Sequence, residues 1–469
     1  MKHTRILVLI ALLGAAAVGL PSLRGATITV MNTNDNGPGS LRQAVADAVN
    51  GDMINFDPSL NGQLIMLTSS QLLINKSITI TGPGADQLRV QRNTAIGTPQ
   101  FRILYVSSGN TVTISGLAIQ GGHVEGDIGG GIYNDQSSIL TLNNCEVGGN
   151  LAGAAGGIYN RNATLIINNC IVEDNSASSD GGGIYNGGAL SGGATLTITN
   201  STVTRNWASS GFGGGIINAG FNSGGATLTI SNSLLMYNRA VIGGTIYNDG
   251  DTYGNAALTI SNSTLSFNSA DNTGGGIDSD GISGTARLTV TNCTLSDNSA
   301  SYGGGIVNDG RNLGIATLTI GNTILNIGGG GAGANLVNSS GTVTSLGYNL
   351  SSDDASSYLN AAGDQNSTNP MLGLIQDNGG PTLTYELLTG SPAIDAGDPN
   401  FTPPPDYDQR GAGYARVLGN RVDIGSFEAQ ATPTPTPSPT PISTPTPTPT
   451  PTATPRGHKQ PHPHPTPHR

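Results

Sequence analysis

The chain has 469 residues, of which only 10% are charged and 4% aromatic, and 70 are glycine. A disordered chain would carry more charge and fewer β-branched residues, whereas the segments between these glycines are rich in Leu, Ile, Val and Thr, as β-strands are. The net charge is −11, and both ends of the chain are basic, so the part between them is more acidic still. Such a body repels phosphate groups, which excludes nucleic acid and anionic membranes as expected partners.

Residues 1–26 have the pattern of a signal peptide. Lys2 and Arg5 precede an apolar run over residues 6–20, and small residues follow up to Ala26. The run is too short for a membrane-spanning helix, so we expect no transmembrane span. The sequence therefore predicts an exported protein, secreted or held at the cell surface.

Residues 27–125 are predicted to form the N-terminal cap and the first turns of the fold. The segment "GSLRQAVADAVNG" (39–51) predicts a helix capped by Ser40, with Leu41, Val45 and Val49 on one side. We expect this helix to cover the open end of the structure, where strands would otherwise be unpaired.

Residues 126–342 repeat one pattern with a period of about 26 to 32 residues. The glycine-rich phrase "GGGIYN" and its variants place an isoleucine at the same point of each copy: Ile132, Ile158, Ile184, Ile216, Ile246, Ile277 and Ile306. A second phrase of the type "LTITNS" ends each time on an asparagine: Asn144, Asn169, Asn200, Asn232, Asn262, Asn292 and Asn322. A third places another asparagine six residues later: Asn150, Asn175, Asn206, Asn238, Asn268 and Asn298.

Each repeat predicts three short strands and three turns, with no helical period. In "TLTIT" (195–199), Leu196 and Ile198 fall on one face and three threonines on the other. One such unit cannot bury its apolar face alone, so the units must stack as turns of a parallel β-helix. The fold class is therefore all-β.

The asparagines of the second phrase are interpreted as structural. An inward amide at a corner can bond to the same amide one turn above and below, and asparagine tolerates left-handed backbone. Beyond the repeats, residues 343–430 are predicted to form irregular turns and a C-terminal cap. Residues 431–469 are predicted to be a disordered Pro/Thr-rich linker with a His-rich end. Cys145 and Cys170 are candidates for a bridge, with unpaired thiols as the alternative.

Two end segments carry a resemblance to a known family. "NTNDNGPGSLRQAVADAVNGDMINFDPSLNG" and "INKSITITGPGAD" resemble secreted bacterial right-handed β-helix proteins of the pectin-lyase-like superfamily. The part from "LGYNLSSD" to "DIGSFE" resembles choice-of-anchor Q domain proteins, and the "GGGI" repeats more weakly resemble polymorphic outer-membrane proteins. The resemblance implies a right-handed parallel β-helix, with polysaccharide-active enzymes among its relatives.

An acidic column is the main candidate for chemistry. Asp249, Asp280 and Asp309 stand three residues after the repeat isoleucine in successive copies, with Asp278 nearby and Asp135 at the matching place further back. Stacked carboxylates could hold Ca²⁺ or act as acid and base in a lyase or glycoside hydrolase. Ordinary turn chemistry is the competing interpretation, and no other cofactor is indicated.

A tyrosine row is the main candidate for binding. Its members follow the repeat isoleucine and are predicted to point outward: Tyr133, Tyr159, Tyr185 and Tyr247. They could stack on sugar rings or contact a protein, or simply stabilise the sheet. We therefore expect a monomeric, non-enzymatic scaffold for adhesion or glycan binding, whose partner is an extracellular polysaccharide or a surface protein, with the enzyme as the alternative.

Overall fold

The computed structural model describes residues 25–327 and 333–430. The chain divides into two units, Met1–Gln430 and Ala431–Arg469, and the fold described below is that of the first. Most of the predicted signal peptide and all of the predicted Pro/Thr-rich and His-rich tail lie outside the described residues. Within the described ranges, no helix is long and apolar enough to cross a membrane.

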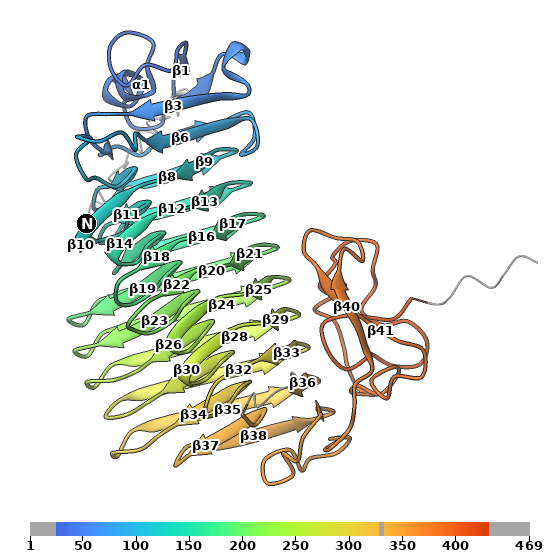
Figure 1. Ribbon diagram of the computed structural model, residues 1–469. Helices are drawn as coiled ribbons and strands as arrows, with labels where there is room; N and C mark the ends of the chain where they lie inside the picture. Colours follow the sequence, from blue (N-terminus) through green and yellow to red (C-terminus); the bar gives the residue numbers. More distant parts are fainter. Residues whose placement is uncertain (1–24, 328–332, 431–469) are drawn as a thin grey trace, which may run out of the picture. The chain divides into compact units, whose positions relative to one another are not determined.

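The first unit is an all-β parallel solenoid of about 11 turns (Figure 1). Four parallel sheets, here called A to D, run along it. Sheet A has twelve strands: β1 (Thr27–Val30), β2 (Met53–Phe56), β5 (Thr79–Thr81), β8 (Thr111–Ser115), β12 (Ile139–Asn143), β16 (Thr164–Asn168), β20 (Gly193–Thr199), β24 (Gly225–Ser231), β28 (Asn255–Ser261), β32 (Thr285–Thr291), β35 (Ile315–Gly321) and β38 (Thr342–Gly347). Sheet B has eleven: β3 (Gln63–Leu67), β6 (Leu88–Arg92), β9 (Ala118–Gln120), β13 (Glu146–Gly148), β17 (Ile171–Glu173), β21 (Thr202–Thr204), β25 (Leu234–Met236), β29 (Thr264–Ser266), β33 (Thr294–Asn298), β36 (Ile324–Ile327) and β39 (Leu350–Ser351).

Sheets C and D complete each turn. Sheet C has ten strands: β4 (Leu72–Ile74), β7 (Leu104–Val106), β11 (Ile132–Asn134), β15 (Ile158–Arg161), β19 (Ile184–Ala189), β23 (Ile216–Phe221), β27 (Ile246–Asp249), β31 (Ile277–Asp280), β34 (Ile306–Asp309) and β37 (Leu336–Ser339). Sheet D has six: β10 (His123–Ile128), β14 (Leu151–Ala154), β18 (Ser176–Ala177), β22 (Trp207–Ala208), β26 (Arg239–Ile242) and β30 (Ser269–Thr273). The prediction of three strands per repeat is therefore wrong for the central turns, because the short strands of sheet D have no alternating apolar pattern.

The core is a stack of inward aliphatic side chains. Leu196 and Ile198 are fully buried, as their alternation predicts, and they lie in register with Leu228 and Ile230 of the next turn. Fully burying a Leu or Ile side chain contributes roughly 1.5–3 kcal/mol. Because each turn supplies only a few such side chains, the stability comes from stacking many turns.

Stacked glycine phrases connect sheet D to sheet C. Gly181 has φ +66°, which a residue with a side chain adopts only with strain. A Cβ atom on Gly182 would lie 2.4 Å from the carbonyl oxygen of Gly214 in the next turn. The phrase is therefore a tight corner, and its repetition follows from the stacking.

Asparagines occupy three kinds of position. The members of the second phrase have left-handed backbone, with φ of 51–53°, but Asn144 and Asn169 are exposed, so the predicted inward direction is wrong for them. A single residue with left-handed backbone forms each corner. At Asn144 the side chain points outward, and the next residue, Cys145, is buried. The asparagines of the third phrase form a buried ladder, whose amides bond from turn to turn at 2.8–3.1 Å. Those of the glycine phrase, such as Asn160 and Asn186, form another at 2.7–2.8 Å.

Helix α1 (Leu41–Asp47) follows β1 at the N-terminal end, and Ser40 Oγ accepts from Gln43 N at 3.2 Å. The helix ends before Val49, which is 62% exposed, so the expectation for Val49 is wrong. A 3₁₀ turn, η1 (Pro58–Leu60), follows β2. Leu41 and Val45 pack into the main core.

The C-terminal segment differs from a simple end cap. Ala355 and Leu359 join the main core beyond β38 and β39. The chain then folds back as residues 370–430, here called the lobe, which contains the antiparallel pair β40 (Leu372–Gln376) and β41 (Thr384–Leu387). The lobe lies beside sheet B (Figure 1), where Thr264 Oγ1 donates to Gln409 Oε1 at 2.6 Å.

Candidate functional site

The acidic column lies on sheet C. The strand register places Asp249 beside Asp280 and Asp280 beside Asp309, in three successive strands, as their spacing predicts. Asp278 lies two residues before Asp280, between Tyr247 and Val307 of the neighbouring turns. The repeat therefore brings four carboxyl groups onto one stretch of one sheet.

Three of these carboxyl groups line one pocket of about 240 Å³, here called the acidic pocket. They are Asp278, Asp280 and Asp309; Asp249 is not in its wall. Ile242 and Thr273 of sheet D, Tyr302 from the corner between sheets D and C, and Arg311 from the turn after β34 also line it. Tyr302 is 49% exposed and gives the pocket an aromatic rim.

Each carboxylate in the pocket already has a protein partner. Asp280 accepts from the Tyr247 hydroxyl at 2.9 Å, and Asp278 accepts from Thr273 Oγ1 at 2.5 Å. Asp309 accepts from Arg311 Nε at 2.8 and 2.9 Å. These bonds fix the three groups, while each carboxylate keeps lone pairs for a further donor.

Burial changes the protonation of this cluster. Burial, with nearby carboxylates, raises the pKa of Asp278 to about 7, and burial raises the pKa of Asp249 to about 7. Burial also raises the pKa of Asp280. A pocket in which Asp278 is partly protonated at neutral pH can both donate to and accept from a hydroxyl-rich ligand.

The tyrosine row forms a stacked ladder on the outer side of sheet C. Ring centroids of Tyr105, Tyr133, Tyr159 and Tyr185 lie 4.9–5.3 Å apart along it, and Tyr247 stacks on Phe212 at 4.9 Å. Tyr133 and Tyr247 are only 9% and 7% exposed. The rings thus lie on the outer side of sheet C, as predicted, and their mutual contacts agree with the interpretation that the row stabilises the sheet. The glycine corners pack against the row and reduce its exposure: a Cβ on Gly181 would lie 3.2 Å from Tyr185 Cβ.

Metal and cysteine candidates find less support. Across residues 25–327 and 333–430, no group of three or more His, Cys, Asp or Glu side chains is arranged to hold a metal ion. Cys145, Cys170 and Cys293 are free thiols. Cys145 N donates to Cys170 Sγ at 3.2 Å, so the two cysteines are stacked neighbours without a bridge.

The repeat pattern of the sequence does not reveal two further features, the turn residues at the acidic pocket and the pocket beneath the lobe. Arg311 and Tyr302 flank the acidic pocket from turns, and no repeat marks them, because turns vary where strands do not. The lobe forms a second pocket against sheet B, which depends on contacts between residues more than 100 positions apart. Only the spacing of the aspartates signalled a site.

The four sheets and the single-residue corners define a parallel β-helix. Residues 68–235 match the family described as right handed beta helix region. The solved structures that resemble this chain include one titled crystal structure of pectate lyase Pel9A, at 16% identity and a TM-score of 0.51, covering 86% of this chain and 97% of that one. At that identity the likeness shows the fold alone. No curated protein matches the chain in sequence.

Proposed function

We propose that the protein is an exported β-helix that binds a polysaccharide in the acidic pocket. The observation that carries this proposal is the meeting of Asp278, Asp280 and Asp309 from two successive turns in one pocket with an aromatic rim. Carboxylates accept pairs of sugar hydroxyls, and an exposed tyrosine offers an apolar face to a ring.

The charge of the pocket narrows the ligand to neutral sugars or amino sugars. Three carboxyl groups face it, and its one guanidinium, Arg311, is already paired with Asp309. The whole chain carries a net charge of −11. A polyanion would be repelled both by the carboxyl groups of the pocket and by the net charge of the whole chain.

A second candidate is a glycoside hydrolase acting at the same pocket. The pKa of about 7 for Asp278 supports it, because a glycosidase needs one protonated carboxyl beside an ionised one. In this proposal Asp278 is the acid, and Asp280 or Asp309 is its ionised partner.

Replacing Asp280 with asparagine should weaken glycan binding about tenfold or more, because the ionised acceptor is lost while the shape is kept. Calorimetry with cello-, xylo-, manno- and chitohexaose and with polygalacturonate measures this, alongside assays for reducing ends and unsaturated products. Turnover that disappears in Asp278→Asn favours the hydrolase. Asp271→Asn is the matched control, since Asp271 is exposed and pairs with Arg239 outside the pocket. Equal binding by Asp280→Asn and wild type would contradict the proposal.

The resemblance to choice-of-anchor Q domain proteins supports display at the cell surface, with the Pro/Thr-rich tail as a spacer. Expression of the full chain in a bacterial host, followed by N-terminal sequencing of the exported form, is expected to give a start near Ala26. Recovery of the chain in the cytoplasm with residues 1–26 still attached would contradict export.

A further inference from the structure

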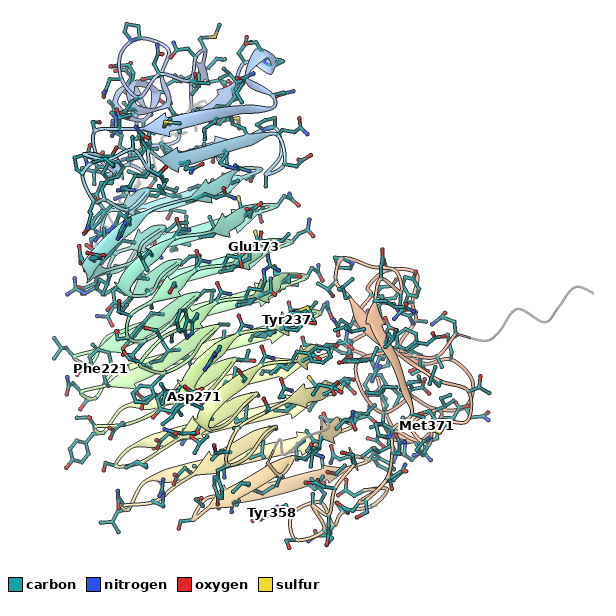
Figure 2. The ribbon with its side chains drawn as sticks, in the orientation of Figure 1. Glu173, Phe221, Tyr237, Asp271, Tyr358 and Met371 are labelled. Carbon is teal, nitrogen blue, oxygen red and sulfur yellow. The ribbon has the colours of Figure 1, made fainter. Side chains whose placement is uncertain are left out.

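A second pocket, of about 460 Å³, lies where the lobe stops covering sheet B; we call it the lobe cleft. Its floor is the outward side of β17, β21 and β25, and Pro381 and Leu383 of the lobe form one wall. Tyr237, 50% exposed, lies on the opposite side. Glu173, at the end of β17, and Tyr237, directly after β25, lie on the side of the solenoid toward the lobe (Figure 2).

The hydroxyl of Thr204 is unsatisfied in this cleft. Thr204 is only 4% exposed, and its Oγ1 has no hydrogen-bond partner among the described residues. In the same register position two turns further on, Ser266 bonds to the Tyr385 hydroxyl of the lobe at 2.5 Å. Thr204 therefore stands at a position where another turn bonds to the lobe, but the lobe supplies no partner here. A buried unpaired hydroxyl costs free energy until a ligand supplies a partner.

Tyr237 forms the corner after β25 and lines the lobe cleft together with Thr204. It has φ +54°, and Phe267 of the next turn has φ +53° at the equivalent corner. The two rings stack at 5.3 Å and are 50% and 38% exposed. Left-handed backbone recurs at this corner from turn to turn, since Asp174, Arg205 and Asp297 have φ of 53–58° as well. The corner therefore belongs to the fold, and the exposed aromatic pair is what distinguishes these two turns.

The cleft continues as a polar track along sheet B. A third pocket, of about 350 Å³, shares Glu173 with the lobe cleft and reaches Gln91 and Gln120. One register row runs through both: Gln91, Gln120, Gly148, Glu173, Thr204 and Met236. Five spacings of about 4.8 Å make a track of about 24 Å.

We propose that this track binds the end of a linear, uncharged polysaccharide, with the terminal sugars in the lobe cleft. Amides and carboxylates along the track suit sugar hydroxyls, and the repeat of the turns is similar to the length of one sugar unit in an extended glycan. Tyr237, Leu383 and Pro381 offer apolar surface to the ring at the closed end. Arg205 also lines the lobe cleft, but it is paired with Glu173 and Asp174. Glu146 and Asp377 then leave the track with an excess of negative charge, which disfavours a polyanion. This site lies on sheet B and does not depend on the acidic pocket of sheet C.

Tyr237→Ala and Thr204→Val test the proposal in the full-length protein. With the neutral hexasaccharide that wild type binds, each variant is expected to lose about tenfold in affinity by calorimetry. Tyr253→Ala and Thr197→Val are the matched controls, since both residues lie outside the cleft. Circular dichroism verifies the folding of all four variants. Because the site is proposed to hold a chain end, reducing the terminal sugar to an open-chain alditol is expected to weaken binding more than adding sugar units to the chain does.

Three outcomes overturn the proposal. The first is the absence of binding to every neutral hexasaccharide, and the second is unchanged affinity in both variants. The third is that the cleft binds a synthetic peptide of residues 431–456 and no sugar. If Asp280→Asn loses all glycan binding while Tyr237→Ala binds as wild type does, this site is refuted and the acidic pocket is supported. The reverse pattern would refute the acidic pocket alone.

Discussion

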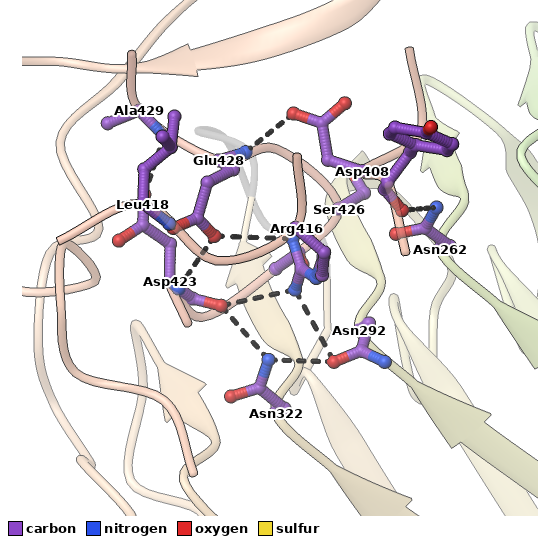
Figure 3. Close-up of polar contacts among 12 residues, drawn as sticks. Asn262, Asn292, Asn322, Asp408, Arg416, Leu418, Asp423, Ser426, Glu428 and Ala429 are labelled. Atoms are coloured by element: carbon purple, nitrogen blue, oxygen red, sulfur yellow. Dashed lines mark hydrogen bonds and ion pairs between the residues drawn. The ribbon is translucent and has the colours of Figure 1, made fainter. Parts of the chain in front are cut away.

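Replacing Arg416 with alanine is expected to release the lobe from sheet B. Arg416 is fully buried, and its Nη2 donates to the carbonyl oxygens of Asp423 and Gly425 at 3.1 and 2.6 Å (Figure 3). The same nitrogen reaches Asn292 Oδ1 at 3.3 Å, on a corner of the solenoid. One guanidinium therefore organises the lobe and also ties it to the solenoid.

The size of the effect follows from the buried groups that lose Arg416 as a partner. Arg416 Nη1 lies 3.9 Å from Glu428 Oε2, and Glu428 is fully buried. Burial raises the pKa of Glu428 to about 8. Glu428 is therefore mostly neutral near pH 7 and does not remain as an unpaired charge. Arg416→Ala instead takes the donor from the buried Gly425 carbonyl oxygen, which costs about 1–3 kcal/mol, and it leaves a cavity where a large side chain was fully buried. The lobe has only a small apolar core of its own, so a loss of this size should open it.

Hydrogen exchange resolved along the chain measures this prediction. Amides of β40 and β41 should lose protection in Arg416→Ala, while those of sheets A and C keep it, because stacked turns depend mainly on their neighbours. Arg287→Ala is the control, since Arg287 lies on sheet A and donates to Asn255 near the surface. Unchanged protection of β40 and β41 would show that Arg416 does not hold the lobe.

Periodic features of the fold were predictable from the sequence. Alternation in "TLTIT" gave the inward direction of Leu196 and Ile198, and equal spacing gave the register of Asp249, Asp280 and Asp309. These features repeat because each turn meets the same neighbours. A repeat marks a position, however, without showing which way its side chain points, and so the outward corner of Asn144 was missed.

Features that depend on one distant contact were not predictable. The lobe bonds Gln409 to Thr264 and Tyr385 to Ser266, and no local pattern relates these residues. The packing of Tyr133 under its neighbours depends on the glycine corners of adjacent turns rather than on its own strand. The acidic column was therefore found from the sequence, whereas the lobe cleft required the structure.

The Asp278→Asn variant is expected to be more stable than wild type at pH 8 and equally stable at pH 4. Burial raises the pKa of Asp278 from 3.8 to about 7 in the folded chain. The folded state therefore binds more protons than the unfolded state across this window, and its stability falls as pH rises from about 4 to about 7. A shift of this size corresponds to roughly 4 kcal/mol at most. Asparagine keeps the shape and the bond from Thr273 without acquiring a charge.

Urea unfolding at pH 4 and pH 8, with hydrogen exchange on β31 and β34, separates this effect from other titrations. The groups that face Asp278 are Asp280, Asp309 and Arg311, with Tyr247 one turn away. Asp280 and Asp249 also have raised pKa values, so part of the pH dependence should persist in the variant. Asp271→Asn should retain the full dependence, since Asp271 is exposed and paired with Arg239. If Asp278→Asn loses stability between pH 4 and pH 8 as steeply as wild type, Asp278 is ionised in the folded chain, and its role as the acid of a hydrolase fails with it.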